Sequence, residues 1–239
     1  MSMVETWVEE IRDVRAPRGY GGRFYGAYPA LVSDIKDPDG QGRVKVKLPW
    51  SPDGQGAAYE AWARLATTMG GNNRGTWFIP DPNDEVLVIF MGGDPRQPCV
   101  VGAFWNGQDK TPQSMDGAGN NYIKTIKSRN GVQITLDDTD GKETMTLQTP
   151  AGQTVTLQDG PGSITLQDSN GNSAKMESAG ITVTASAKVT VNASTAEITA
   201  GTLTVNAGMS TFSGVVQADT VITNSVVSAS YTPGAGNIW

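Results

Sequence analysis

Ile134-Thr135-Leu136 is the first of seven triplets in which a threonine stands between two apolar residues. The others are Met145-Thr146-Leu147, Val155-Thr156-Leu157, Ile164-Thr165-Leu166, Ile181-Thr182-Val183, Val189-Thr190-Val191 and Leu203-Thr204-Val205. Alternation of apolar and polar residues predicts a β-strand with one buried face. The threonines at 135, 146, 156 and 165 lie 11, 10 and 9 residues apart, and turn-forming residues separate the triplets. This near-regular spacing predicts a stack of short strands of the β-solenoid or β-prism kind.

This half of the chain lacks the large side chains that would fill a core. Residues 116–239 hold four of the 17 aromatic residues, and only three charged residues follow position 177. Disorder usually accompanies high charge and few β-branched residues, whereas Val, Ile and Thr are abundant here, so we expect order. Short strands with one small apolar face cannot enclose a core within one chain, because each repeat needs neighbours to bury its face. We therefore expect three copies to share the core as a homotrimer, which also leaves no strand edge exposed.

The N-terminal segment, residues 1–26, predicts a short amphipathic helix followed by a linker. Ser2 and Glu5 form a capping-box pair. Apolar residues with the spacing of one helical face follow, namely Val4, Trp7, Val8 and Ile11. A helix of this length is marginal in water by itself. We expect its apolar face to contact either the trimer or a hub protein.

Residues 27–110 predict a small closed barrel. Six short stretches have strand character, and Gly-, Pro- and Asp-rich turns separate them; the stretches are 28–35, 42–49, 61–67, 77–78, 85–91 and 99–105. Five or six strands in about 80 residues indicate an oligonucleotide/oligosaccharide-binding (OB) barrel. Residues 111–125 would then be a connector, 126–230 a trimeric shaft and 231–239 an apolar C-terminal tip. The predicted fold class is thus all-β, with a short N-terminal helix, an OB barrel and a trimeric intertwined β-helix.

Composition excludes several functions. The chain has no histidine, so it cannot form a Ser-His-Asp or Cys-His relay or a His-ligated metal site. Its single cysteine, Cys99, can form neither an intrachain disulfide nor a thiolate zinc site. A net charge of −6 argues against nucleic acid as a stable ligand. The first 14 residues lack the features of a signal peptide, so we expect synthesis in the cytoplasm.

Several motifs in a fixed order carry a family resemblance. They are Tyr28-Pro29-Ala30-Leu31-Val32, Asp37-Pro38-Asp39-Gly40-Gln41-Gly42-Arg43, Trp62-Ala63-Arg64-Leu65, Gly75-Thr76-Trp77-Phe78-Ile79-Pro80 and Gly102-Ala103-Phe104-Trp105-Asn106-Gly107. The chain resembles the central spikes of contractile tails, the phage baseplate assembly protein V group related to the valine-glycine repeat spikes of type VI secretion. The resemblance implies a homotrimeric, non-enzymatic spike in a virion tail baseplate or an equivalent injection particle. Its barrels would attach to the baseplate hub, and sheath contraction would drive its β-helix transiently into the target cell envelope.

The sequence departs from that family at its end. Short phage spikes carry a His-X-His iron site at the tip, and this chain has no histidine. The C-terminal segment is instead a Gly/Pro turn leading to an apolar end. We expect either a small tip-capping protein of the PAAR-like kind or folded-back tails to cover it, with Tyr231, Ile238 and Trp239 as the contact residues.

Two residue groups leave other functions open. Asp137, Asp138, Asp140 and Glu143 could bind calcium or cleave a glycosidic bond, although a solvated turn is the simpler interpretation. Trp62, Trp77 and Trp105 could stack on sugars, although core or subunit contacts are more common in a small barrel. The alternatives to a spike are therefore a trimeric glycan-binding tail fibre or adhesin and a β-helical polysaccharide depolymerase. We assign no catalytic, cofactor-binding or metal-binding residue.

Overall fold

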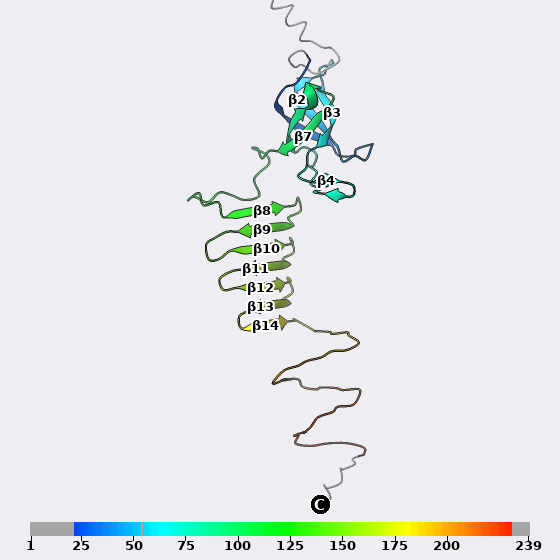
Figure 1. Cartoon of the computed structure of the whole chain (residues 1–239), viewed down its shortest axis with the longest axis vertical. Helices are drawn as coiled ribbons and strands as arrows, with labels where there is room; N and C mark the ends of the chain where they lie inside the picture. The colour runs from blue at the N-terminus through cyan, green and yellow to red at the C-terminus, as the bar shows by residue number, and fades with distance from the viewer. Residues whose placement is uncertain (1–21, 54, 231–239) are drawn as a thin grey trace, which may run out of the picture. The chain divides into compact units, whose positions relative to one another are not determined.

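The computed structural model describes residues 22–53 and 55–230, and their regular secondary structure is almost entirely β (Figure 1). A closed barrel contains β1 (Ala27–Asp34), β2 (Val44–Pro52), β3 (Ala58–Leu65), β6 (Glu85–Phe90) and β7 (Pro98–Ala103). One 3-10 turn, Met91–Gly93, is the sole helical element of these residues, and no helix among them is long and apolar enough to span a membrane. The predicted N-terminal helix and tip contacts lie outside the described residues.

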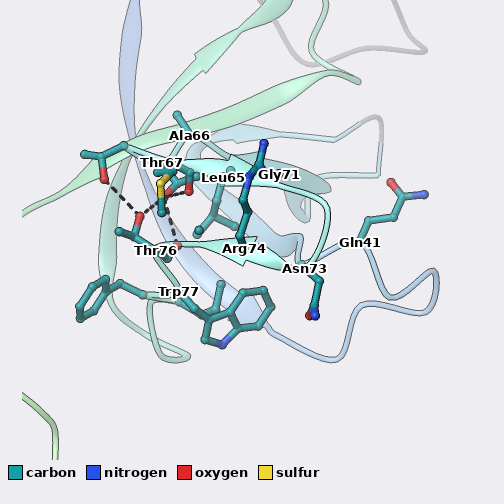
Figure 2. Close-up of a pocket in the computed structure, with 16 residues that line it drawn as sticks. Gln41, Leu65, Ala66, Thr67, Gly71, Asn73, Arg74, Thr76 and Trp77 are labelled. Carbon is teal, nitrogen blue, oxygen red and sulfur yellow. Dashed lines mark hydrogen bonds between the residues drawn. The ribbon is translucent and has the colours of Figure 1, made fainter.

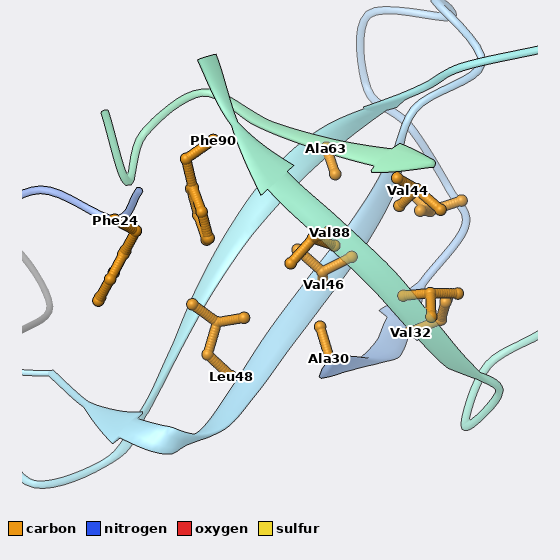
Figure 3. Close-up of a cluster of buried hydrophobic side chains, with 11 residues drawn as sticks. Phe24, Ala30, Val32, Val44, Val46, Leu48, Ala63, Val88 and Phe90 are labelled. Carbon is orange, nitrogen blue, oxygen red and sulfur yellow. The ribbon is translucent and has the colours of Figure 1, made fainter. Parts of the chain in front are cut away.

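The barrel closes in the order β1-β2-β3-β7-β6. All of its strand pairs are antiparallel except β3 with β7. Alternation decides which side chains face inward: on β2, Val44, Val46 and Leu48 are buried, whereas Lys47 between them is exposed. These residues join a core cluster of small aliphatic side chains, with Phe24 and Phe90 at one end (Figure 3). The sequence prediction of an OB-type barrel is confirmed.

One predicted strand is wrong. Residues 77–78 form no strand; they follow a small two-stranded arm made of β4 (Gly70–Gly71) and β5 (Arg74–Gly75). The arm turns at Asn73, which has a left-handed φ of 53°. At Gly75 any Cβ would lie 2.5 Å from the Met69 carbonyl oxygen. The two sides of the arm can therefore lie this close together only because residue 75 is a glycine. The β propensity of Trp77 and Phe78 is overridden because the arm closes just before them.

After the barrel the chain forms a meander of seven short strands that pair strictly in chain order. They are β8 (Ile123–Lys127), β9 (Gln133–Asp137), β10 (Thr144–Gln148), β11 (Thr154–Gln158), β12 (Ser163–Gln167), β13 (Ser173–Glu177) and β14 (Gly180–Thr184). The predicted triplets fall at matching positions: Thr146 lies opposite both Thr135 and Thr156. Threonines thus occupy one face of the sheet, and the flanking apolar residues occupy the other.

The meander ends at Thr184. Residues 185–230 form no strand within the chain, so the strands predicted at 189–191 and 203–205 are absent from the single chain. The segment from Val189 onward separates as a unit of its own. A strand needs a neighbour for its backbone hydrogen bonds, and within the described residues this segment has none.

An acidic turn closes one loop of the barrel. The Asp37 carboxylate accepts hydrogen bonds from the Arg43 guanidinium (2.6 Å) and from the backbone N–H groups of Asp39, Gln41 and Arg43 (3.1, 2.8 and 3.1 Å). Arg43 also pairs with Asp39 (2.5 Å). The Arg43 side chain, helped by the backbone donors, holds the pKa of Asp37 well below its usual range.

This turn predicts an acid-dependent stability. Because the pKa of Asp37 is lower in the folded state, its stabilising effect is complete above the unfolded value of about 3.9 and is lost as the pH falls through the folded value. In urea unfolding at pH 4, 3 and 2, Asp37→Asn should flatten the loss of stability seen in the parent chain. Asp39→Asn, at a more exposed carboxylate, is the matched control. Parallel curves for the parent and Asp37→Asn would contradict the assignment.

Candidate trimer interface

One face of the meander is aliphatic from β9 to β14, and at β8 the exposed Lys124 shares this face with Ile126. Its side chains form two columns across the strands: Ile126, Ile134, Leu147, Val155, Leu166, Ala174 and Val183 in one, and Leu136, Met145, Leu157, Ile164, Met176 and Ile181 in the other. In the single chain this face is the more exposed one; Leu147 is 38% exposed and Ile181 71%. A continuous apolar face of this kind marks an interaction surface, because soluble chains rarely leave one uncovered.

The opposite face of the meander is mostly polar, and several of its side chains have hydrogen-bond or ion-pair partners. Thr125, Thr135, Thr146, Thr156 and Thr165 run along its centre, followed by Lys175 and Thr182. Thr125 donates its hydroxyl hydrogen to the Ile134 carbonyl (2.9 Å), and Gln133 donates its amide N–H to the Thr135 hydroxyl (2.6 Å). Lys175 forms an ion pair with Glu177 (2.6 Å). Only the aliphatic face therefore requires a partner.

Residues 185–230 also leave apolar side chains uncovered, and in addition their backbone forms no strand ladder. Large apolar side chains recur along the segment, and many are largely exposed, from Val216 at 61% to Val227 at 99%. The segment also forms no strand ladder within the described residues. Apart from Ser186, whose N–H donates to the Asn172 side chain (2.9 Å), the backbone of this segment has no ladder of protein partners. A Val- and Thr-rich segment of this kind needs neighbouring strands to pair its backbone groups and cover its apolar side chains.

The acidic residues at the β9–β10 turn have structural roles. Asp137 accepts hydrogen bonds from the N–H (2.9 Å) and the hydroxyl (2.6 Å) of Thr139, and the hydroxyl contact is the main reason that its pKa is lowered. A general acid in glycoside cleavage needs a raised pKa, so the shift is in the opposite direction. Asp138 forms an ion pair with Lys124. Among the described residues no three His, Cys, Asp or Glu side chains gather as metal ligands. These contacts favour the solvated-turn interpretation.

The three tryptophans have different environments. Trp62 is partly covered by Lys45 and Arg43, whose charged groups lie 5.0 and 5.7 Å from its ring. Trp77 and Trp105 are 76% and 67% exposed, so neither fills the barrel core. Trp77 instead lies against Gly42, where a Cβ would be only 3.1 Å from its ring. Figure 2 shows Trp77 next to the arm and to the hydroxyl contacts of Thr76.

The sequence prediction did not identify the β4–β5 arm. Its short strands are two residues each and consist largely of glycine. The available signal was the pair of asparagines between two glycine-containing stretches, which is a turn signature. The candidate contact residues Val4, Trp7, Val8 and Ile11 at the N-terminus, and Tyr231, Ile238 and Trp239 at the C-terminus, lie outside the described residues.

Two parts of the chain match models of known protein families. Residues 28–105 match the family model for the type VI secretion system/phage-baseplate injector OB domain, and residues 144–209 match the phage baseplate V C-terminal trimerisation domain. The second match covers β10 to β14 and continues into the segment without strands. The aliphatic face from β10 to β14 and residues 185–209 therefore lie within the trimerisation-domain match.

Individual relatives are spike proteins of type VI secretion systems. VgrG1b of Pseudomonas aeruginosa is 28% identical over 127 residues, which is 50% of this chain and 17% of the relative. VgrG5 of the same organism is 38% identical over 78 residues, 32% of this chain and 10% of the relative. VgrG3 of Vibrio cholerae is 27% identical over 128 residues, which is 49% of this chain and 13% of the relative. The chain thus matches less than a fifth of the length of these relatives.

The aliphatic face gives a matched pair of substitutions on β10. Leu147 lies on the aliphatic face, and the next residue, Gln148, points to the other face. Leu147→Glu should abolish the trimer, because it would bury an unpaired carboxylate in a shared core. Gln148→Glu introduces the same side chain on the solvated face and should leave the trimer intact. Light scattering coupled to size-exclusion chromatography measures the mass of each variant. If Leu147→Glu and Gln148→Glu have the same mass, the aliphatic face is not the trimer interface.

Proposed function

Because the chain belongs to the family of phage-baseplate and type VI secretion spikes, we propose that it is the homotrimeric central spike of a contractile injection apparatus. The observation that carries the proposal is the uncovered aliphatic face of β9 to β14 together with the unpaired segment 185–230, both within or next to the trimerisation match. Three copies would bury the three aliphatic faces against one another. The relatives' description as spike proteins supports the same assignment.

The proposed work of the trimer is mechanical. A spike has to carry axial load when the sheath contracts, and it must not unravel as it enters the envelope. In the meander each strand is hydrogen bonded to its neighbours within the chain, and in segment 185–230 the partner strands would come from the other two copies. Such a shared structure unfolds only when many contacts break together. The sparse charge after residue 177 lowers the cost of desolvating the entering part.

The remaining assignments in this proposal rest on the sequence and the family. The barrels would face the baseplate hub, with Val4, Trp7, Val8 and Ile11 as the contact residues. A PAAR-like protein would cover the tip at Tyr231, Ile238 and Trp239. The protein would have no enzymatic activity and would reside in a virion tail baseplate or an equivalent particle. The hydrogen-bonded environment of Asp137 supports the non-enzymatic assignment.

The first test is the mass of the purified full chain. Light scattering should give three times the chain mass of 25.2 kDa, and cross-linking should trap dimers and trimers but no larger species. A monomer would overturn the proposal.

The second test uses contractile particles assembled with variant chains. Particles carrying Leu147→Glu should lose the ability to penetrate target cells, whereas particles carrying Gln148→Glu should keep it. Normal penetration by particles carrying Leu147→Glu would exclude a piercing role for the trimer.

A further inference from the structure

Four exposed aromatic side chains gather at one end of the barrel. They are Trp77 (76% exposed), Phe78 (70%), Phe104 (43%) and Trp105 (67%). The strand pairing brings them together: β3 and β7 are parallel and end at the same side, and β6 starts there, since Phe104 donates its N–H to the Glu85 carbonyl (2.9 Å). Trp77 and Phe78 belong to the connection from β3 to β6. We call this set the aromatic end of the barrel.

Hydrogen bonds fix the backbone directly before Trp77. Before Trp77, the Thr76 N–H donates to the Met69 carbonyl (3.0 Å), and the Thr67 hydroxyl donates to the Thr76 carbonyl (3.1 Å) (Figure 2). The Trp77 ring lies against Gly42 on one side and leaves the rest of its surface to solvent. Rigid, exposed aromatic side chains of this kind are typical of interface anchors, because binding costs them little conformational entropy.

Trp105 is held in the same way. Its neighbour Phe104 is tied to Glu85 through the backbone, and Asn106 donates its side-chain N–H to the Glu85 carboxylate (2.8 Å). Asn106 also accepts the backbone N–H groups of Gln108 and Asp109, both at 2.8 Å. The tryptophan is therefore presented by a closed turn and not by a loose linker.

The position of the aromatic end along the chain indicates its partner. The chain leaves the barrel at Ala103, directly before Phe104 and Trp105, and runs on into the meander and the trimerisation domain. In a trimer with three-fold symmetry, the three chains converge on one axis where the shaft starts. An ion pair between Arg129, in the first turn of the meander, and Asp81, shortly after Phe78, links this end of the barrel to the start of the shaft (2.9 Å).

We infer that the aromatic end packs against neighbouring copies of the chain and forms an aromatic collar where the barrels meet the shaft. The collar extends the trimer interface of the proposed function from the aliphatic meander to the barrel. A symmetric ring brings two different patches of each copy together, so Trp77 and Phe78 of one copy would meet the Phe104–Trp105 turn of the next. The outer surface of β2 and β3 is less suited to packing between copies, because its outward side chains include the charged residues Lys45, Lys47, Glu60 and Arg64.

Hydroxyl-radical footprinting of the full-length trimer tests the collar. The oxidation rate of each residue is divided by its rate in the urea-unfolded chain. Trp77, Phe78, Phe104 and Trp105 should be protected as strongly as the buried Phe90, whereas Tyr25, 67% exposed at the opposite end of the barrel, should stay reactive. A trimer in which the four residues react like Tyr25 overturns the collar and leaves the spike proposal standing. A monomer overturns both.

A double variant provides an independent readout. Trp77→Ala with Trp105→Ala should keep the trimer mass, since the shaft still holds the copies together, and should raise the oxidation of Phe78 and Phe104. Trp62→Ala, outside the collar, is the control and should leave both protected. If Phe78 and Phe104 stay protected in the double variant, the collar is wrong. If the parent trimer gains protection at these aromatics only after lipopolysaccharide is added, the surface binds glycan and the collar is likewise wrong.

Discussion

The structure depends on an aliphatic face that the chain cannot cover by itself. In the meander, Leu147, Leu157 and Leu166 point away from the polar face and remain between 38% and 44% exposed. Each fully buried leucine contributes about 1.5–3 kcal/mol relative to exposure, so two columns of such residues represent a large free energy that only association releases. The barrel differs because its aliphatic residues already close around one another. One chain thus contains a barrel with its own closed core and a meander whose aliphatic face the chain leaves uncovered.

The same constraint explains why the shaft changes character at Thr184. Up to that residue each strand pairs with the next strand of its own chain, and partners are needed only for the aliphatic side chains. Beyond it, the chain forms no strand ladder and its large apolar side chains are exposed. In the trimer proposed here, the first part contributes one wall per copy and the second part is built from strands of different copies. The match to the trimerisation domain spans this change without a break.

Much of this could be predicted from the sequence because the signals are local. The triplets with a central threonine specify strand, face and register together, and Thr135, Thr146 and Thr156 do align across neighbouring strands. The valines of β2 predict the inward face of the barrel in the same way. By contrast, Trp77 has a strand-forming side chain in a loop, because a glycine arm closes before it. The strands predicted at 189–191 and 203–205 are absent from the single chain, because it offers them no neighbouring strand.

Hydrogen–deuterium exchange of the purified trimer tests whether residues 185–230 are ordered by other copies of the chain. Their amides should exchange slowly, as slowly as those of β9 to β12, although no strand ladder within the chain protects them. Slow exchange should disappear in the Leu147→Glu variant, where the copies separate. Fast exchange of residues 185–230 in a trimer of confirmed mass, with β9 to β12 still protected, would contradict the account.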